Sequence, residues 1–498
     1  MRIVSIVLLP PALLAAQAAS QPVLRLNTPD QALGAAFDWA QRQALQYASK
    51  GGDPVGPWYE AALPNREAFC MRDVSHQSMG AHALRLDAQN RNMLEKFAVN
   101  ISEARDWCSY WEINRHNLPA PVDYRNDDDF WYNLPANFDV LDACFRMYLW
   151  SGDRAYVDGA AFQTFYRRTV NEYVWRWELQ PDRIMARQRI MNVRSASDSA
   201  KRFARARGIP SYDEGRSDFT VAADLIAAQV AAYTSYARIE KLRGKAREAS
   251  QLLQQAANAR SLLNTAWWDE ARNEYYSYVD LRHKLIPGAI TPFILYFGAA
   301  SESRIPFARE ALLRRISERP INVEGQSHLP EILYRYGRHE AAYEQLLDLS
   351  SPGKPRREYP EVSYAVIGAM VNGLMGIEVD PTRVQPGAAW NQGMDGVVMT
   401  FPRLTSRTAV AELEHLPVRG NDISVRHEGT GKTKLTNIIG PALAWEACFP
   451  GSAGRLVMNG RRVRARVLGS YGPEGSMSCA TTQVAAGVSV TVEQSKTQ

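Results

Sequence analysis

The sequence has few cysteines, and none of them is spaced as a metal ligand. Only 5 of the 498 residues are cysteine, and no C-x-x-C pair occurs, which argues against a zinc site and a disulfide-rich scaffold. The sequence also lacks a glycine-rich phosphate loop, an H-E-x-x-H pair and a G-x-S-x-G turn. We therefore expect no bound cofactor and no structural metal.

The chain also has little excess charge and few long hydrophobic runs. Lys and Arg number 58 against 53 Asp and Glu, a net charge of +5, which is too small over this length to indicate a nucleic-acid partner. Only the N-terminal stretch is strongly apolar: Arg2 precedes the run Ile3–Leu14, and the A-x-A stretch Ala16–Ala18 follows. This pattern predicts a signal peptide over residues 1–20, and hence a periplasmic or secreted protein with no membrane contact after cleavage.

The hydrophobic pattern changes once along the chain. From Thr28 to about Ile377, apolar residues recur at helical spacing between turns rich in Gly, Pro and Asp. Beyond that point Pro and Gly separate short runs of alternating polarity. The sequence therefore predicts a mainly α domain over residues 21–378 and a sandwich-like antiparallel β-domain over residues 379–498.

Two features refine the expected β-domain. The dipeptide Asn459–Gly460 lies between the strand-like runs Leu456–Met458 and Val463–Val467, and it is a strong signal for a two-residue hairpin turn. Cys448 and Cys479 both lie in this region, and they are the one plausible disulfide pair for an oxidising compartment.

Four segments place polar side chains directly ahead of expected helices. The segments and their polar residues are Met71–His76 with Arg72, Asp73 and His76; Pro210–Phe219 with Tyr212, Glu214 and Asp218; Asn322–Pro330 with Glu324 and His328; and Arg357–Tyr364 with Glu358 and Glu361. Each pattern alone also fits a helix cap or a solvated loop. Together they supply the acidic residues on separate loops that inverting glycoside hydrolysis requires, where two carboxyl groups stand about 6.5–9.5 Å apart.

A fifth segment, Asp127–Asp139, combines consecutive carboxylates with aromatic side chains. Its residues Asp128, Trp131 and Asn133 could bind a sugar, because aromatic rings stack on pyranose faces while polar groups accept and donate to hydroxyls. A solvated acidic loop is the second interpretation, and a calcium site with hard oxygen ligands is the third.

In their order along a helical chain, the four segments resemble the six-hairpin glycosidase superfamily, which includes glucoamylases, trehalases, processing glucosidases, rhamnosidases and exo-mannosidases. The resemblance covers about residues 60–380 and implies an (α/α)6 barrel followed by a β-domain. It also implies an inverting glycoside hydrolase that needs no cofactor and binds an oligo- or polysaccharide.

The resemblance assigns roles to individual residues. Arg72 and Asp73 correspond to the pair that grips hydroxyls of the sugar at the cleavage subsite. Asp218 corresponds to the general acid, although Ser217 stands where the family has Trp. Glu361, or failing that Glu358, corresponds to the general base. The remaining candidate substrate contacts are His76, Asp128, Trp131, Asn133, Tyr212, Glu214, Glu324 and His328.

Two other functions remain open at this point. Helical toroids with a β-domain also occur among polysaccharide lyases, for which Tyr212, His76, His116 and Asn133 would be the candidate residues. The other alternative is a glycan-binding protein without catalytic activity. The pattern leaves the sugar, its linkage and the oligomeric state open.

Overall fold

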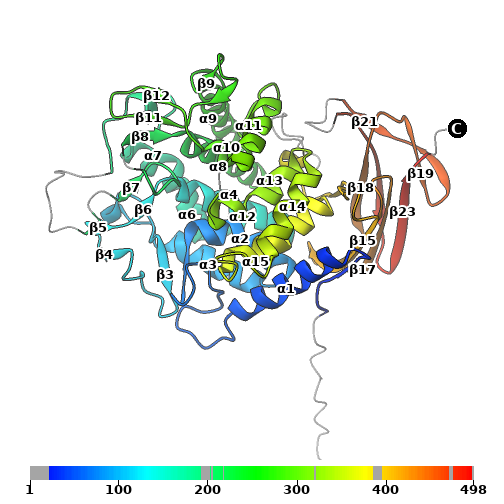
Figure 1. Ribbon diagram of the computed structural model, residues 1–498. Coiled ribbons are helices and arrows are strands. Elements are labelled where there is room, and N and C mark those ends of the chain that lie inside the picture. The colour runs from blue at the N-terminus through cyan, green and yellow to red at the C-terminus, as the bar shows by residue number, and fades with distance from the viewer. Residues whose placement is uncertain are drawn as a thin grey trace, which may run out of the picture.

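The computed structural model describes residues 22–191, 202–203, 206–216, 218–318, 321–384, 395–469 and 475–495. It has a helical region and two larger β-sheets built mainly from the last hundred residues (Figure 1). The mainly helical character with several sheets confirms the coarse fold prediction. The predicted signal peptide lies outside the described residues.

Six helices, mostly buried, form the interior of the helical region. They are α2 (Met71–Ala83), α4 (Pro135–Ser151), α8 (Ala223–Leu242), α10 (Thr291–Tyr296), α13 (Leu329–Arg335) and α15 (Pro360–Gly368). Each of these helices contacts the next one in this order. The contact of α13 is with Ala369–Leu374, the π-helical continuation of α15, and α15 packs against α2. Because they are covered on nearly all sides, their apolar residues do not form a single stripe.

Other helices pack outside the interior set and bury one face each. The longer ones are α1 (Gln31–Tyr47), α3 (Asp87–Val99), α6 (Ala160–Arg168), α9 (Ala246–Thr265), α11 (Ile305–Glu318) and α14 (His339–Ser350). In α1 the buried positions Leu33, Ala36, Phe37, Ala40 and Ala44 follow the spacing of one helical face. Asp30 starts this helix, since its carboxylate accepts a hydrogen bond from the Leu33 amide. Within the described residues, no helix is long and apolar enough to cross a lipid bilayer.

Short elements fill the connections. The short helices are α5 (Ala155–Asp158), the π-helical turn Thr169–Tyr173, α7 (Val174–Arg176), α12 (Val323–Ser327) and α16 (Pro381–Val384). The short strands are β2 (Ala68–Cys70), β3 (Glu112–Asn114), β4 (Tyr124–Asn126), β5 (Asp129–Phe130), β6 (Tyr132–Asn133), β7 (Arg207–Ile209), β8 (Phe219–Ala222), β9 (Trp268–Asp269), β10 (Glu274–Tyr275), β11 (Tyr278–Asp280) and β12 (Leu285–Ile286). Strands β2, β6 and β8 run directly into α2, α4 and α8, so they fix the loops from which these interior helices begin.

Two sheets account for the C-terminal region. The seven-stranded sheet has the order β1-β15-β16-β17-β23-β19-β20, and the five-stranded sheet has the order β13-β14-β18-β22-β21. Their strands are β1 (Arg25–Asn27), β13 (Ile377–Glu378), β14 (Val398–Thr400), β15 (Val410–Val418), β16 (Asn421–Glu428), β17 (Lys432–Ile439), β18 (Leu443–Pro450), β19 (Arg455–Met458), β20 (Arg461–Arg464), β21 (Arg466–Leu468), β22 (Met477–Val484) and β23 (Val488–Gln494). The first strand of the chain thus belongs to the C-terminal sheet.

The hairpin prediction is confirmed, and one expected strand is divided. Asn459 and Gly460 join β19 to β20 with φ values of 47° and 78°, as a turn with two left-handed residues requires. The expected run Val463–Val467 instead splits between β20 and β21, which belong to different sheets. The break falls at Ala465, whose amide donates to the Gly454 carbonyl rather than to a neighbouring strand.

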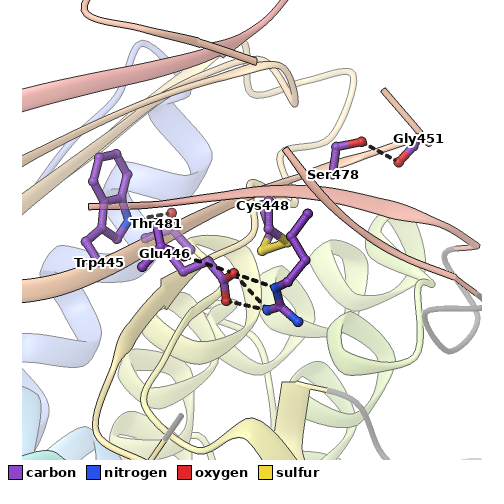
Figure 2. Close-up of a disulfide and its surroundings, with 9 residues drawn as sticks. Trp445, Glu446, Cys448, Gly451, Ser478 and Thr481 are labelled. Carbon is purple, nitrogen blue, oxygen red and sulfur yellow. Dashed lines mark hydrogen bonds and ion pairs between the residues drawn. A yellow bond between two sulfur atoms is a disulfide. The ribbon is translucent and has the colours of Figure 1, made fainter. Parts of the chain in front are cut away.

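The predicted disulfide is also confirmed. Cys448 on β18 lies directly opposite Cys479 on β22 and is bonded to it. Figure 2 shows the bridge beside Glu446, whose carboxylate accepts hydrogen bonds from the Arg466 guanidinium. The cross-link therefore joins two neighbouring strands of the five-stranded sheet.

Candidate functional site

A cavity of about 200 Å³ opens where the interior helices begin. It is lined by Ala62, Leu63, Arg66, Cys70, Arg72, Asp73, Trp111, Glu112, Asp123, Trp131, Glu214, Glu324, Tyr359 and Glu361. The lining holds six carboxyl groups but only two guanidinium groups. Several of these side chains stand in the first turn of a helix, where the positive end of the helix dipole favours a carboxylate.

Arg72 links the carboxylates on one wall of the cavity. It stands in the first turn of α2, with Nε 3.4 Å from Asp73 Oδ1 and Nη1 3.5 Å from Glu214 Oε1. Its guanidinium carbon lies 5.8 Å from the centre of the Tyr212 ring. A guanidinium held in this way still has donors free to turn toward a ligand hydroxyl. The role of Arg72 and Asp73 in binding sugar hydroxyls stays a prediction.

Glu361 is the most deeply buried candidate carboxylate in the lining. It stands in the first turn of α15, immediately after Pro360, and only 4% of the residue is exposed. Its Oε1 accepts no hydrogen bond from any described residue. Burial raises the pKa of Glu361 well above its usual value, and the negative charge of Asp73 adds to this while Arg72 opposes it. A carboxyl group so poorly satisfied is typical of functional sites.

Glu214 is held by a chain of hydrogen bonds from the acidic and aromatic segment Asp127–Asp139. Asn133 Nδ2 donates to Glu214 Oε1 at 3.2 Å, and Trp131 Nε1 donates to Asn133 Oδ1 at 2.8 Å. Burial raises the pKa of Glu214, Arg72 lowers it, and the charges of Glu324 and Asp73 raise it further. The relay fixes both the Trp131 ring and the Glu214 carboxyl group at the cavity.

Two of the predicted catalytic residues lie outside the cavity lining. Asp218 is exposed over 61% of its side chain, and both its oxygens accept from Arg216, at 2.7 and 3.1 Å. Glu358 is exposed, and its backbone carbonyl accepts a hydrogen bond from the Tyr47 hydroxyl. The structure therefore brings Glu214 and Glu361 to one cavity, together with Arg72, but not Asp218 or Glu358.

The predicted histidines and Tyr212 form a buried layer next to the lining. His76 and His328 stack with ring centres 3.7 Å apart and planes 13° apart. Burial lowers the pKa of His76 to about 3, helped by the charge of Arg146. Tyr212 donates its hydroxyl to Asp139 at 2.9 Å. Because His76 follows Arg72 by one helical turn, this layer supports the cavity wall from behind.

The three consecutive aspartates do not converge on one point. Asp127 binds Arg105 and Asp129 accepts the amides of Arg202 and Phe203, whereas the Asp128 side chain is 78% exposed. Among the described residues, the one group of three potential metal ligands within bonding reach is Glu446, Cys448 and Cys479. Since its two thiols form the disulfide, this group is not a metal site.

A second acidic cluster in the lining had no sequence signal. Arg66 Nη1 lies 2.9 Å from Glu112 Oε2 and 3.8 Å from Asp123 Oδ2. Burial and the nearby Asp123 carboxylate raise the pKa of Glu112, against the influence of Arg66. These residues come from separate loop positions and share no spacing that a motif could reveal.

Comparison with solved structures finds similar folds among carbohydrate-active enzymes. An α-L-rhamnosidase from Dictyoglumus thermophilum aligns over 95% of this chain and 51% of its own, at 13% identity and a TM-score of 0.58. A Streptomyces avermitilis α-L-rhamnosidase complexed with L-rhamnose aligns over 95% and 42%, at 15% identity and a TM-score of 0.54. A protein described as a kojibiose phosphorylase, from the human microbiome, aligns over 93% and 67%, at 8% identity and a TM-score of 0.51.

The similarity is one of fold. No family model matches the chain, and no curated protein sequence matches it either. The chain spans 51% of the Dictyoglumus rhamnosidase and less of the Streptomyces enzyme. At these identities the chain shares with the two rhamnosidases and the phosphorylase the arrangement of a helical region and accompanying β-sheets.

Proposed function

We propose that this chain is a glycoside hydrolase that removes a single terminal sugar ring from its substrate. The observation that carries the proposal is the convergence of Glu214 and Glu361 with Arg72 and Asp73 on one cavity. Most glycosidases use a pair of carboxyl groups as their catalytic residues. The fold shared with two rhamnosidases supports the same class of chemistry.

The cavity volume argues for exo action. At about 200 Å³, it is smaller than the ~300–1,000 Å³ of pockets that hold drug-sized ligands. One pyranose ring fits a space of this order, whereas a chain of several rings needs a longer groove. Trp111, Trp131 and Tyr359 supply aromatic surface in the lining for the ring or for the adjoining sugar.

We assign Glu214 as general acid and Glu361 as general base of an inverting reaction. Glu214 replaces the sequence-based candidate Asp218, because Glu214 lines the cavity and its pKa is raised, as a proton donor requires. Glu361 keeps the base role that the sequence suggested for it, and it stands in the first turn of α15. Burial raises the pKa of Glu361 even though Arg72 opposes this effect, so Glu361 acts as a base only above its raised pKa, and we expect activity to increase as pH rises toward that value.

We also propose the barrel, the β-domain and the signal peptide that the sequence predicts. The closed sequence of contacts among the interior helices, each with an outer neighbour, supports an (α/α)6 barrel over residues 21–378. The two sheets support a separate β-domain over residues 379–498, which recruits β1 from the N-terminus. Export through a signal peptide over residues 1–20 would allow the disulfide to form and persist.

The charge of the cavity disfavours the polysaccharide lyase alternative. A lyase must bind a uronate carboxylate, yet the lining carries six carboxyl groups against two guanidinium groups. The candidate bases are also poorly placed: His76 and Tyr212 are absent from the cavity lining, and His116 is exposed. The acidic lining fits an uncharged sugar better.

Hydrolysis of a panel of aryl glycosides, α-L-rhamnosides included, tests the proposal. Glu214→Gln should retain activity on substrates with good leaving groups, since these need little protonation. Glu361→Gln should lose activity on every substrate, with partial recovery in azide. Glu358→Gln is the matched control, because it stands ahead of the same helix but is exposed. Wild-type activity in both cavity variants would contradict the assignment.

A further inference from the structure

A second and larger hollow lies on the outer side of the helical region. Its volume is about 890 Å³, and it shares no lining residue with the candidate active site. Tyr233 and Tyr236 of α8 form a buried floor, Trp175 of α7 stands on one side, and Gln251 and Gln255 of α9 stand on the other. We refer to this hollow as the outer groove.

Trp175 is unusual for a surface residue. At 69% exposure, it is the most exposed of the large hydrophobic side chains in the described part of the chain. It belongs to α7, the helix that directly follows the π-helical turn Thr169–Tyr173, and such turns are frequent at functional sites. Its indole stacks on no other ring among the described residues, so a full aromatic face is available to a ligand.

The remaining lining supplies neutral hydrogen-bonding groups. Gln180 Oε1 is buried and has no partner among the described residues, and Asn171, Gln251 and Gln255 add further side-chain amides to the same lining. Side-chain amides both donate and accept. A buried unpaired acceptor is costly unless a ligand or water satisfies it, so the groove favours a ligand that carries hydroxyl donors.

The charged residues of the outer groove largely neutralise one another. Arg167 lies 3.2 Å from Glu172, and Lys245 lies 3.1 Å from Glu240. The exposed Glu248 adds one more carboxylate, so the lining holds two basic and three acidic side chains and has little net charge to select an ionic ligand. An aromatic face, an amide rim and paired charges together match a sugar chain that carries no charge, whose rings have flat apolar faces edged by hydroxyl groups.

We propose that the outer groove binds a neutral oligosaccharide segment, separately from the catalytic cavity. Its volume exceeds that of the cavity more than fourfold, enough for several sugar rings. A polymer held there would raise the local concentration of its ends at the enzyme, as linked binding sites do in general. This binding does not depend on the identity of the catalytic residues.

Affinity electrophoresis through gels that contain galactomannan, xyloglucan or dextran tests the outer groove. At least one polysaccharide should retard the wild-type protein, and Trp175→Ala should weaken that binding at least tenfold while leaving hydrolysis of a small aryl glycoside unchanged. Leu118→Ala is the matched control, because Leu118 is also exposed, at 59%, but lies outside the groove. Retardation should also survive in Glu361→Gln.

Three results would overturn the proposal. The first is the absence of retardation in all three gels, and the second is full retardation of Trp175→Ala. The third is loss of retardation in Glu361→Gln, which would place the binding in the catalytic cavity. Light scattering provides a further check: a dimer that dissociates in Trp175→Ala would show that the groove binds a second copy of the chain instead.

Discussion

The helical region contains two clusters of buried charged side chains. The carboxylates of the two clusters differ in how completely arginines pair with them. In the deeper cluster, formed by residues of α8, α13, α16 and the turn after β13, each arginine faces a carboxylate: Arg238 lies 2.8 Å from Asp380, and Arg383 lies 2.9 Å from Glu331. In the cavity, carboxyl groups outnumber guanidinium groups and Glu361 Oε1 has no described partner.

The comparison separates stability from function. Arg335 and Arg383 hold the pKa of Glu331 below its usual value, although burial alone would raise it. In the cavity, burial raises the pKa values of Glu361 and Glu214. Breaking a buried pair of the first kind destabilises the fold, because it leaves an uncompensated charge. An excess of charge of one sign is typical of a site that binds a ligand or carries out a reaction.

The largest effect should come from Glu361→Gln. We expect activity to fall by ~10²–10⁴-fold, the usual contribution of a general acid or base. The melting temperature should be unchanged or higher, because the substitution removes an unsatisfied carboxyl group. Steady-state kinetics and calorimetry on the same preparation measure both. A variant that loses stability along with activity would show that Glu361 belongs with the paired cluster.

Arg238→Met should give the opposite result. Removing the guanidinium breaks the buried ion pair between Arg238 and Asp380, and breaking a buried pair costs ~3–5 kcal/mol of unfolding free energy. Urea denaturation measures the loss. Arg216→Met is the control, since Arg216 forms an exposed pair and should cost little. Equal losses in the two variants would show that the deeper cluster is not a source of stability.

The two clusters should also respond oppositely to pH. The raised pKa of Glu361 means that the folded protein holds a proton that the unfolded chain releases above about pH 4.3. The contribution of Glu361 to the unfolding free energy is therefore fully present below that pH. It decreases as the pH rises toward the pKa that Glu361 has in the folded protein. Arg238 lowers the pKa of Asp380 although burial opposes this. The contribution of Asp380 to the unfolding free energy is therefore present above about pH 3.9 and is lost as the pH falls.

Melting curves between pH 3 and pH 8 test this contrast. Glu361→Gln should flatten the decline on the alkaline side, and Asp380→Asn should flatten the decline on the acidic side. Glu358→Gln, at an exposed position, should follow the wild type throughout. If the melting temperatures of Glu361→Gln and Asp380→Asn depended on pH in the same way, the two clusters would not differ as proposed.

The smallest effect should come from Asp218→Asn. Its exposed pair with Arg216 contributes only ~0–1 kcal/mol, and Asp218 does not line the cavity. We expect stability within ~0.5 kcal/mol of wild type and activity within a few-fold. A loss of 100-fold or more with normal stability would restore Asp218 as the general acid.

The sequence predicted what local patterns encode. The change from helical to alternating periodicity, the Asn459–Gly460 turn and the Cys448–Cys479 bridge depend on neighbouring residues or on one strand pair, and all are present. The placement of Arg72 and Glu361 at helix N-termini follows from the same local signals.

Contacts between distant loops were beyond such patterns. The choice between Glu214 and Asp218 depends on the Asn133 amide, 81 residues from Glu214, and no spacing rule connects the two. Arg66 meets Glu112 across 46 residues for the same reason. A motif identifies which loop carries the carboxyl groups, whereas the direction of each side chain is decided by partners from other loops.

The pairing of β1 with β15 sets an order for folding during synthesis. Thr28, next to β1, donates its hydroxyl to the Val410 carbonyl at 2.8 Å, across 382 residues. At ~5–20 residues per second, the ribosome needs roughly 20–80 s to make the chain between them. The first strand therefore waits, unpaired, while the helices from α1 to α15 are produced. Such a distant contact is costly in chain entropy until its surroundings are folded, so the β1–β15 pairing closes the fold and does not nucleate it.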